Sequence, residues 1–109
     1  MLNALASARA QGRTARVLLD DEIDENQAAV DFLTSHDIQA RLDGAARRVH
    51  LKTVLADGHT LLAGSTNWSD ISFKYSHEAN LVLRDAVLGA GLKAFHDALW
   101  ADPHTLHVR

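Results

Sequence analysis

The chain has 109 residues, of which 47% are hydrophobic and 23% are charged, so it is unlike a disordered polypeptide and fits one small globular domain over residues 1–109. The formal net charge of -3 argues against the strongly basic surface that tight nucleic-acid binders usually carry. Because the chain has no cysteine, it can form neither disulfides nor thiolate metal sites.

The first helix and the first strand are predicted from the spacing of apolar residues. Leu2, Leu5 and Ala6 recur at helical intervals, and Gly12 lies where a helix would end in a residue with a left-handed backbone. Residues 17–19 then form a short apolar run that is typical of a buried strand. We therefore expect a helix followed by a strand.

A second helix and a second strand are predicted in the same order. The acidic run DDEIDEN, residues 20–26, is predicted as a loop that leads into a helix, because the exposed amides of a first helical turn favour carboxylates. Ala29, Val30 and Leu33 mark the helix, and residues 38–42 form the strand that follows it.

The middle of the chain predicts a hairpin and one further strand. Residues 49–56 are predicted as a buried strand, Asp57-Gly58 as a turn, and residues 60–63 as the returning strand. After an intervening loop, residues 79–83 form another apolar run with the length of a strand.

The last predicted element is an amphipathic helix. Its apolar face carries Leu88, Leu92, Phe95 and Leu99. Trp100 is expected in the core at the end of this helix, and Pro103 prevents the helix from continuing. Strands that alternate with helices indicate the α/β class, with a mixed β-sheet sandwiched by helices.

Two side chains suited to chemistry share one face of the predicted strand over residues 49–56. His50 and Lys52 are two residues apart, so they project side by side. An imidazole beside an ammonium is suited to attack on an anionic centre, because the lysine neutralises charge that would repel a nucleophile. The loop of residues 64–67, Gly-Ser-Thr-Asn, follows the neighbouring strand and can donate further hydrogen bonds. This combination predicts a phosphate ligand.

Together these residues spell the pattern H-x-K-x4-D-x6-G-S-x-N. With average residue frequencies, six fixed positions match by chance on the order of once in 10⁸ starting points, so unrelated loop residues are a poor explanation. The pattern resembles the signature of the phospholipase D superfamily. Its fixed positions are filled by His50, Lys52, Asp57, Gly64, Ser65 and Asn67. The resemblance continues in SDISFKYSHEANLVL, where Glu78 occupies the family's acidic position and Ser76 replaces the usual asparagine.

The resemblance implies a chemical mechanism for the histidine. In this superfamily one histidine attacks phosphorus to give a phosphohistidine, and another protonates the leaving oxygen. By position, His50 resembles the nucleophile or the acid. Glu78 resembles the residue that accepts a hydrogen bond from the far ring nitrogen and stabilises the imidazolium. No metal and no cofactor is implied, because lysine and imidazolium supply the positive charge.

The other motif residues are implied to bind phosphate or to shape the site. Lys52 and Asn67 would hold phosphate oxygens, and Ser65 would support them. Asp57 is counted with the catalytic residues of the motif, although in such folds it resembles an architectural residue more than a chemical one.

The resemblance also implies a partner, because a single motif does not supply two histidines. A two-fold homodimer would bring each motif near its own copy. The alternative is that these residues are one half of a longer chain with two motifs. The family's domain usually opens with strands ahead of the first helix, whereas this chain begins inside that helix, so the sequence leaves open whether it is a phospholipase D-like half that lacks the opening strands.

Three functions remain open at this point. The first is a metal-independent phosphodiesterase that acts on nucleic acid, since NWS after the GST turn resembles the family's small endonucleases. The second is a phospholipase D or phosphatidyl transferase that acts on phospholipids. The third is a non-catalytic half or subunit that completes a partner's site.

The sequence shows no targeting segment. Its first residues, MLNALASARAQGRTAR, lack the leader of a signal peptide, and no run of about 18 apolar residues occurs. We therefore expect no stable membrane insertion, and the compartment stays unknown with a cytoplasmic location as the default.

Overall fold

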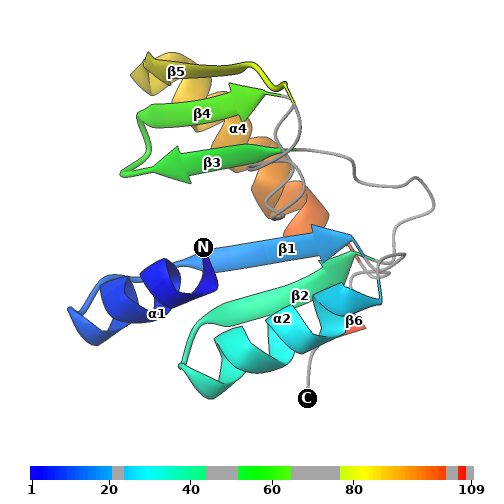
Figure 1. Ribbon diagram of the computed structural model, residues 1–109. Coiled ribbons are helices and arrows are strands. Elements are labelled where there is room, and N and C mark those ends of the chain that lie inside the picture. Colours follow the sequence, from blue (N-terminus) through cyan, green and yellow to red (C-terminus); the bar gives the residue numbers. More distant parts are fainter. Residues whose placement is uncertain (21–23, 44–51, 65–76, 103–105, 108–109) are drawn as a thin grey trace. The chain divides into compact units, whose positions relative to one another are not determined.

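The computed structural model describes residues 1–20, 24–43, 52–64, 77–102 and 106–107 (Figure 1). The chain divides into two compact units. Unit 1 consists of Met1–His50 and Leu99–Arg109, and unit 2 consists of Leu51–Ala98. None of the helices within the described ranges is long and apolar enough to cross a membrane.

Unit 1 is an α/β unit with a three-stranded mixed sheet. Its elements are α1 (Leu2–Ala10), β1 (Arg16–Asp20), α2 (Glu25–Ser35), β2 (Gln39–Asp43) and β6 (Leu106–His107). β1 and β2 are parallel, while β6 runs antiparallel to β2. This arrangement confirms the α/β class and the mixed pairing expected from the sequence.

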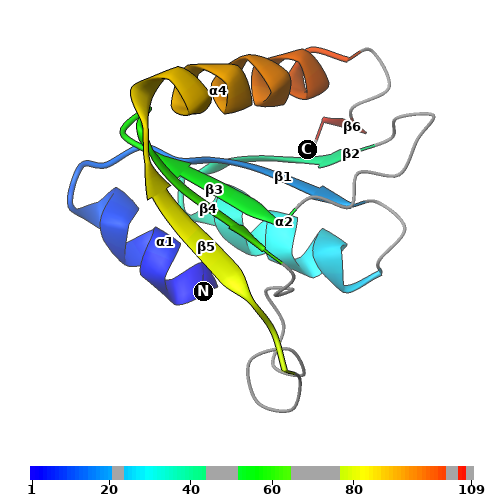
Figure 2. The same ribbon diagram turned by 90° about the horizontal axis from the view of Figure 1, so that it is seen from above.

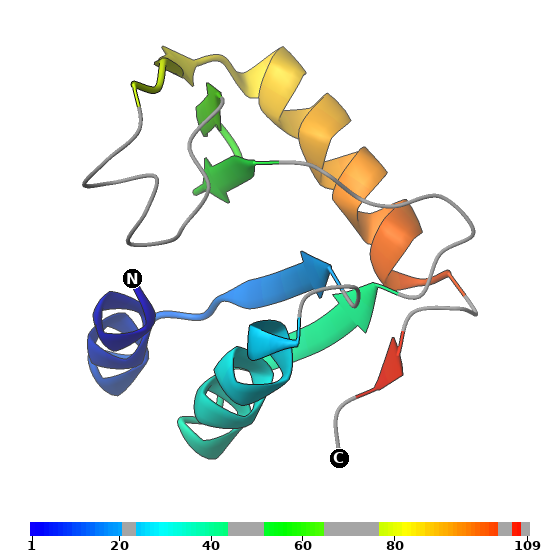
Figure 3. The ribbon, with the colours of Figure 1, turned by 45° about the vertical axis from the view of Figure 1, so that its right-hand side comes forward.

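The core of unit 1 lies between its sheet and α2, which follows one face of β1 and β2 (Figure 3). Alternate residues of β2, Ala40 and Leu42, are buried there against Val30 and Leu33 of α2. Because successive strand residues point to opposite faces, Gln39 and the other odd-numbered residues of β2 belong to the other face of the sheet. The helical spacing that predicted α2 therefore identified its buried face correctly.

Two backbone turns connect the elements of unit 1. Gly12 has φ 84°, which is the left-handed residue predicted after the first helix. Asp37, after α2, has φ 59°, a conformation that aspartate tolerates better than most residues. Arg9 of α1 holds Asp37 in place through a 2.5 Å ion pair to its carboxylate and a 3.1 Å hydrogen bond to its carbonyl oxygen.

Unit 2 contains an antiparallel sheet of three strands, which lie side by side in Figure 2. The strands are β3 (Thr53–Ala56), β4 (Thr60–Gly64) and β5 (Asn80–Arg84). At the β3–β4 turn, Asp57 has φ 56° and Gly58 has φ 75°, as the Asp-Gly sequence predicted.

The strand predicted over residues 49–56 is longer than the strand that the structure describes. β3 begins at Thr53, so Lys52 lies directly before it rather than within it. Residues 49–51 lie outside the described residues. The prediction that His50 and Lys52 share one pleat therefore remains a prediction.

The long helix α4 (Ala86–Trp100) is directly preceded by an aspartate, Asp85. The carboxylate of Asp85 accepts hydrogen bonds from the backbone N–H groups of Val87 and Leu88, at 2.8 and 2.9 Å. These bonds satisfy amides that have no partner within the helix. The helix that the sequence predicted here is confirmed.

The predicted burial of unit 2 is only partly correct. Leu88 and Phe95, on the expected apolar face of α4, are 53% and 52% exposed. Leu81 and Val82 of β5 are 59% and 64% exposed. Large exposed apolar side chains that gather in one region are typical of surfaces that contact another polypeptide or another part of a larger fold.

Candidate functional site

The antiparallel register of unit 2 gathers three points of the chain at one edge of its sheet. Thr53, the first residue of β3, pairs with Ala63 of β4. Gly64, the last residue of β4, pairs with Asn80, the first residue of β5. We call this edge, formed by Lys52, Gly64 and residues 78–80, the site edge. In Figure 1, β3 begins and β4 ends on the same side of the sheet.

Gly64 allows β4 to approach β5 more closely than any other residue would. A Cβ atom on Gly64 would collide with the side-chain oxygen of Asn80 and the carbonyl oxygen of Ala79, and it would lie 2.6 Å from the Cα of Asn80. Two of these three atoms belong to the backbone, so they cannot move aside by a change of rotamer. The glycine of the sequence pattern therefore has a physical reason at this position.

The structure places two predicted site residues at the site edge. Lys52 lies half-buried immediately before β3, and Glu78 lies exposed two residues before β5. His50, Ser65 and Asn67 lie outside the described residues, so their contacts stay predictions.

Asp57 lies at the opposite end of β3, in the hairpin turn, where it is exposed. At about 3.3 Å per residue, the Cα atoms of Lys52 and Asp57 are roughly 16 Å apart, which is too far for both side chains to reach one phosphoryl group. This position agrees with a structural part for Asp57 in the turn.

The groups at the site edge have complementary chemical uses. The ammonium of Lys52 has three donors and a fixed positive charge, which suit it to hold phosphate oxygens. The carboxylate of Glu78 can accept a hydrogen bond from an imidazole. Among the described residues, no three histidine, aspartate or glutamate side chains gather as ligands for a metal ion.

Sequence reasoning missed the part that Asn80 takes in this edge, because its contact with Gly64 depends on the register of β4 and β5. It also placed Trp100 in the core, whereas Trp100 is half-buried and carries arginine side chains over its ring. One signal for these arginines was present in the sequence, since Arg16 directly precedes one apolar run and Arg41 interrupts another.

A profile described as "Cardiolipin synthase, PLD-like domain" matches residues 1–100. This match includes the site edge and nearly the whole chain. The chain belongs to the phospholipase D superfamily. The resemblance predicted from the sequence pattern is therefore confirmed.

One relative in this superfamily is the mitochondrial cardiolipin hydrolase of Chlamydomonas reinhardtii, which is 31% identical over 91 residues. The aligned region is 83% of this chain and 41% of the relative, so the chain spans about two fifths of that protein's length.

Two solved structures share the fold. The phospholipase D family member Nuc from Salmonella typhimurium has a TM-score of 0.89 and 20% identity over 99% of this chain and 72% of its own. NucT from Helicobacter pylori has a TM-score of 0.83 and 18% identity over 97% of this chain and 72% of its own. These similarities confirm the phospholipase D-like fold.

One substitution tests whether the close approach at Gly64 shapes the site edge. We expect Gly64→Ala to destabilise the protein by about 1–3 kcal/mol, because the new methyl group must push the backbone of residues 79–80 away. Displacement of catalytic groups by about 1 Å can lower turnover by roughly 10²-fold. Urea unfolding and phosphodiesterase assays measure the two effects.

Gly91→Ala is the matched control, since a Cβ at Gly91 meets no atom within 4 Å. We expect Gly91→Ala to raise stability by up to about 1 kcal/mol, because alanine favours helix over glycine. Equal stability and activity of the two variants would contradict the close-approach account of Gly64.

Proposed function

We propose that this chain contributes one motif to a metal-independent phosphodiesterase site that works through a phosphohistidine. The observation that carries the proposal is the convergence of Lys52, Gly64 and Glu78 on one edge of the unit 2 sheet. Superfamily membership supports the same conclusion.

In the proposed reaction, the imidazole of His50 attacks phosphorus. A P–N bond forms while the ester P–O bond breaks, and the leaving oxygen takes a proton from the imidazole of the second motif. Water or an alcohol then attacks the phosphohistidine and gives its proton to the second imidazole, so that a new P–O bond forms, the P–N bond breaks and His50 is released. Glu78 accepts a hydrogen bond from the far ring nitrogen, so that the other nitrogen faces phosphorus and the imidazolium is stabilised.

The remaining motif residues are assigned to binding and structure. Lys52 and Asn67 hold the non-bridging phosphate oxygens, and Ser65 supports them by a further hydrogen bond. Asp57 keeps the β3–β4 turn in its left-handed conformation and takes no part in the chemistry, consistent with its position away from the site edge.

The proposed substrate is a phosphodiester of nucleic acid, and the second candidate is a phospholipid. The phospholipid alternative is favoured by the name of the Chlamydomonas reinhardtii relative, a cardiolipin hydrolase. Both substrates contain the same phosphodiester group, so the chemistry of the site edge serves either one.

The second motif is proposed to come from a second copy of this chain. The exposed apolar residues of β5 and α4 support an arrangement in which another polypeptide covers part of unit 2. A two-fold axis would bring like motifs together, as a site with two histidines requires. A second half within a longer chain is the alternative source of the motif.

The proposal is tested by measuring the turnover of bis(p-nitrophenyl) phosphate over a range of protein concentrations. Sedimentation at each concentration measures the fractions of monomer and dimer. We expect specific activity to rise as dimer replaces monomer, and we expect EDTA to leave it unchanged. Inhibition by EDTA that added metal reverses would contradict the metal-independent mechanism. Full activity of the monomer would contradict the homodimer. Inactivity at every concentration would support the alternative in which the chain is a non-catalytic half or subunit that completes a partner's site.

A further inference from the structure

Two glycines show which side of α4 packs against unit 2 and which side is open. Gly89 is buried, and a Cβ atom there would collide with the carbonyl oxygen of Gly58 and lie 3.1 Å from the Cα of His59. A Cβ atom on Gly91 would meet no other atom within 4 Å. Because successive residues of an α-helix are about 100° apart, these two glycines lie on opposite sides of α4. The helix therefore has an inner side at Gly89 and an outer side at Gly91.

The outer side of α4 is formed by apolar residues that are all exposed. We call it the α4 outer face, and its residues are Val87, Leu88, Gly91, Ala94, Phe95 and Ala98. Within α4, all of which the structure describes, Lys93 is the only exposed residue with a polar side chain, and it lies outside this face. A surface helix usually directs its apolar side to the core and its polar side to water. The reverse arrangement indicates a surface that another molecule covers.

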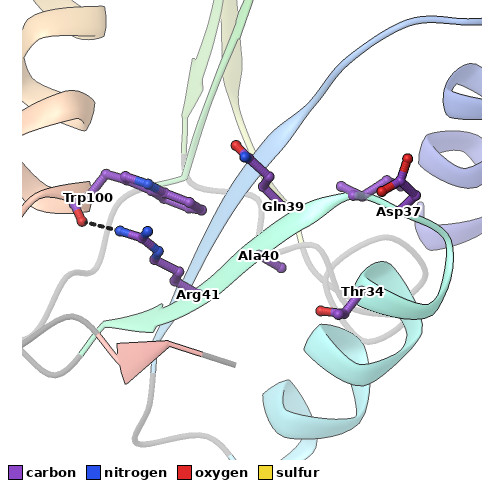
Figure 4. Close-up of a pocket in the computed structure, with 7 residues that line it drawn as sticks. Thr34, Asp37, Gln39, Ala40, Arg41 and Trp100 are labelled. Atoms are coloured by element: carbon purple, nitrogen blue, oxygen red, sulfur yellow. Dashed lines mark hydrogen bonds between the residues drawn. The ribbon is translucent and has the colours of Figure 1, made fainter. Parts of the chain in front are cut away.

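The helix that carries this face is held at both ends. At its start, the carboxylate of Asp85 accepts two backbone hydrogen bonds. At its end, Arg41 donates a 2.7 Å hydrogen bond from Nη1 to the carbonyl oxygen of Trp100, and its Cζ atom lies 4.1 Å from the centroid of the indole ring (Figure 4). These bonds satisfy terminal groups that have no partner within a helix. The α4 outer face is therefore a preformed surface, which lowers the entropy lost on association.

The absence of charge from the α4 outer face limits the chemistry of its partner. Nucleic acids and charged protein surfaces are bound through side chains of opposite charge. Helices that lie on lipid surfaces usually carry several lysine or arginine residues on their polar side, whereas the Lys93 of α4 is paired with Asp97 at 2.6 Å. An uncharged polypeptide surface fits best. A second copy of the same face meets this requirement, because it brings no like charges together.

The sizes of the side chains on the α4 outer face also suit a second copy. Phe95 and Gly91 have residue 93 as their midpoint, and so do Leu88 and Ala98. An antiparallel pair of identical helices centred there places Phe95 of each helix against Gly91 of the other, and Leu88 against Ala98. The open space at Gly91 can receive the phenyl ring. Large residues thus meet small ones, as in closely packed helix pairs.

We propose that the α4 outer face binds the same face of a second copy of this chain, as an antiparallel helix pair with its two-fold axis near residue 93. Each pairing of a large residue with a small one occurs twice in such an isologous contact. One pair of 15-residue helices makes a small interface, so the Kd is expected on the order of 10 µM. This inference goes beyond the proposed function, because it names a contact surface and involves no catalytic residue.

Disulfide cross-linking tests the register of the pair. The chain has no cysteine, so a single introduced cysteine reports one contact. Ala94 lies on the outer face next to the predicted axis, so Ala94→Cys is expected to form a disulfide with its own copy. Lys93→Cys is the matched control, and we expect at least about 10-fold less cross-linked dimer from it, because a disulfide needs Cα atoms within about 7 Å. Equal cross-linking of the two variants, or none of Ala94→Cys, would overturn the proposal.

An exchange of side-chain sizes tests the predicted pairing by sedimentation equilibrium. Gly91→Phe is expected to raise the Kd of the dimer at least about 10-fold, because its ring would meet Phe95 of the other copy. Addition of Phe95→Ala to this variant should return the Kd to within about 3-fold of the wild type, since a large residue again faces a small one. Gly91→Ala keeps a small residue there and is the control, with the same tolerance expected. A double variant as weak as Gly91→Phe would contradict the pairing.

Other occupants of the α4 outer face would be detected by two further measurements. We expect no binding to phosphatidylcholine vesicles, and binding that Phe95→Ala abolishes would assign the face to lipid and overturn the proposal. A wild-type chain that stays monomeric at about ten times the expected Kd would also overturn it. Because cross-linking is measured without turnover, the two proposals fail separately. Hydrolysis of the reporter without cross-linking at residue 94 would remove only the helix pair, whereas cross-linking without hydrolysis would remove only the chemistry.

Discussion

Replacement of His50 by alanine is expected to lower phosphodiesterase turnover at least about 10³-fold, because loss of a nucleophile removes the covalent route altogether. The KM for a small reporter should change much less, since the residues proposed to bind its phosphate, Lys52 and Asn67, are unchanged in this variant. Steady-state kinetics with bis(p-nitrophenyl) phosphate measures both constants.

His59→Ala is the control for this experiment. His59 is exposed beside the β3–β4 turn, at the end of the sheet away from the site edge, and one ring nitrogen lies 3.0 Å from the Oγ1 of Thr60. We expect its turnover to stay within about 2-fold of the wild type, as for a surface substitution away from the chemistry. Near-normal turnover of His50→Ala would remove His50 from the reaction.

The second large effect is expected for Lys52→Ala, at about 10²–10³-fold in turnover. Loss of one donor that stabilises a developing anion has this magnitude in other enzymes. Lys93→Ala is the matched control, because Lys93 is an exposed lysine of unit 2 whose 2.6 Å ion pair joins it to Asp97, one helical turn away on α4. Equal activity of the two lysine variants would show that Lys52 binds no phosphate.

The elements of the fold were predictable where local chemistry decides the structure. Gly12 ends a helix and Asp57-Gly58 makes a turn because their backbones reach positive φ, which most residues avoid. The apolar spacing of α2 identified Val30 and Leu33, which are buried as predicted. Such signals lie within a few residues of one another, so a single sequence is enough to read them.

The features that depend on pairing between distant segments were not predictable in the same way. The need for glycine at residue 64 comes from its register with Asn80, and the cluster around Trp100 joins residues from β1, β2 and α4. The periodicity of α4 predicted an apolar face but not its exposure, because burial depends on what covers the helix. The sequence pattern of the predicted phosphodiesterase site could nevertheless be recognised, because its residues lie close together along the chain.

The most direct test of the account is to trap the covalent intermediate. A reaction with a phosphodiester substrate is quenched in alkali, where the P–N bond survives, and the digested protein is analysed by mass spectrometry. The account predicts a phosphoryl adduct on His50 that disappears in the His50→Ala variant and forms in the presence of EDTA. An active enzyme that forms no adduct, or forms it on a residue other than His50, would contradict the phosphohistidine mechanism.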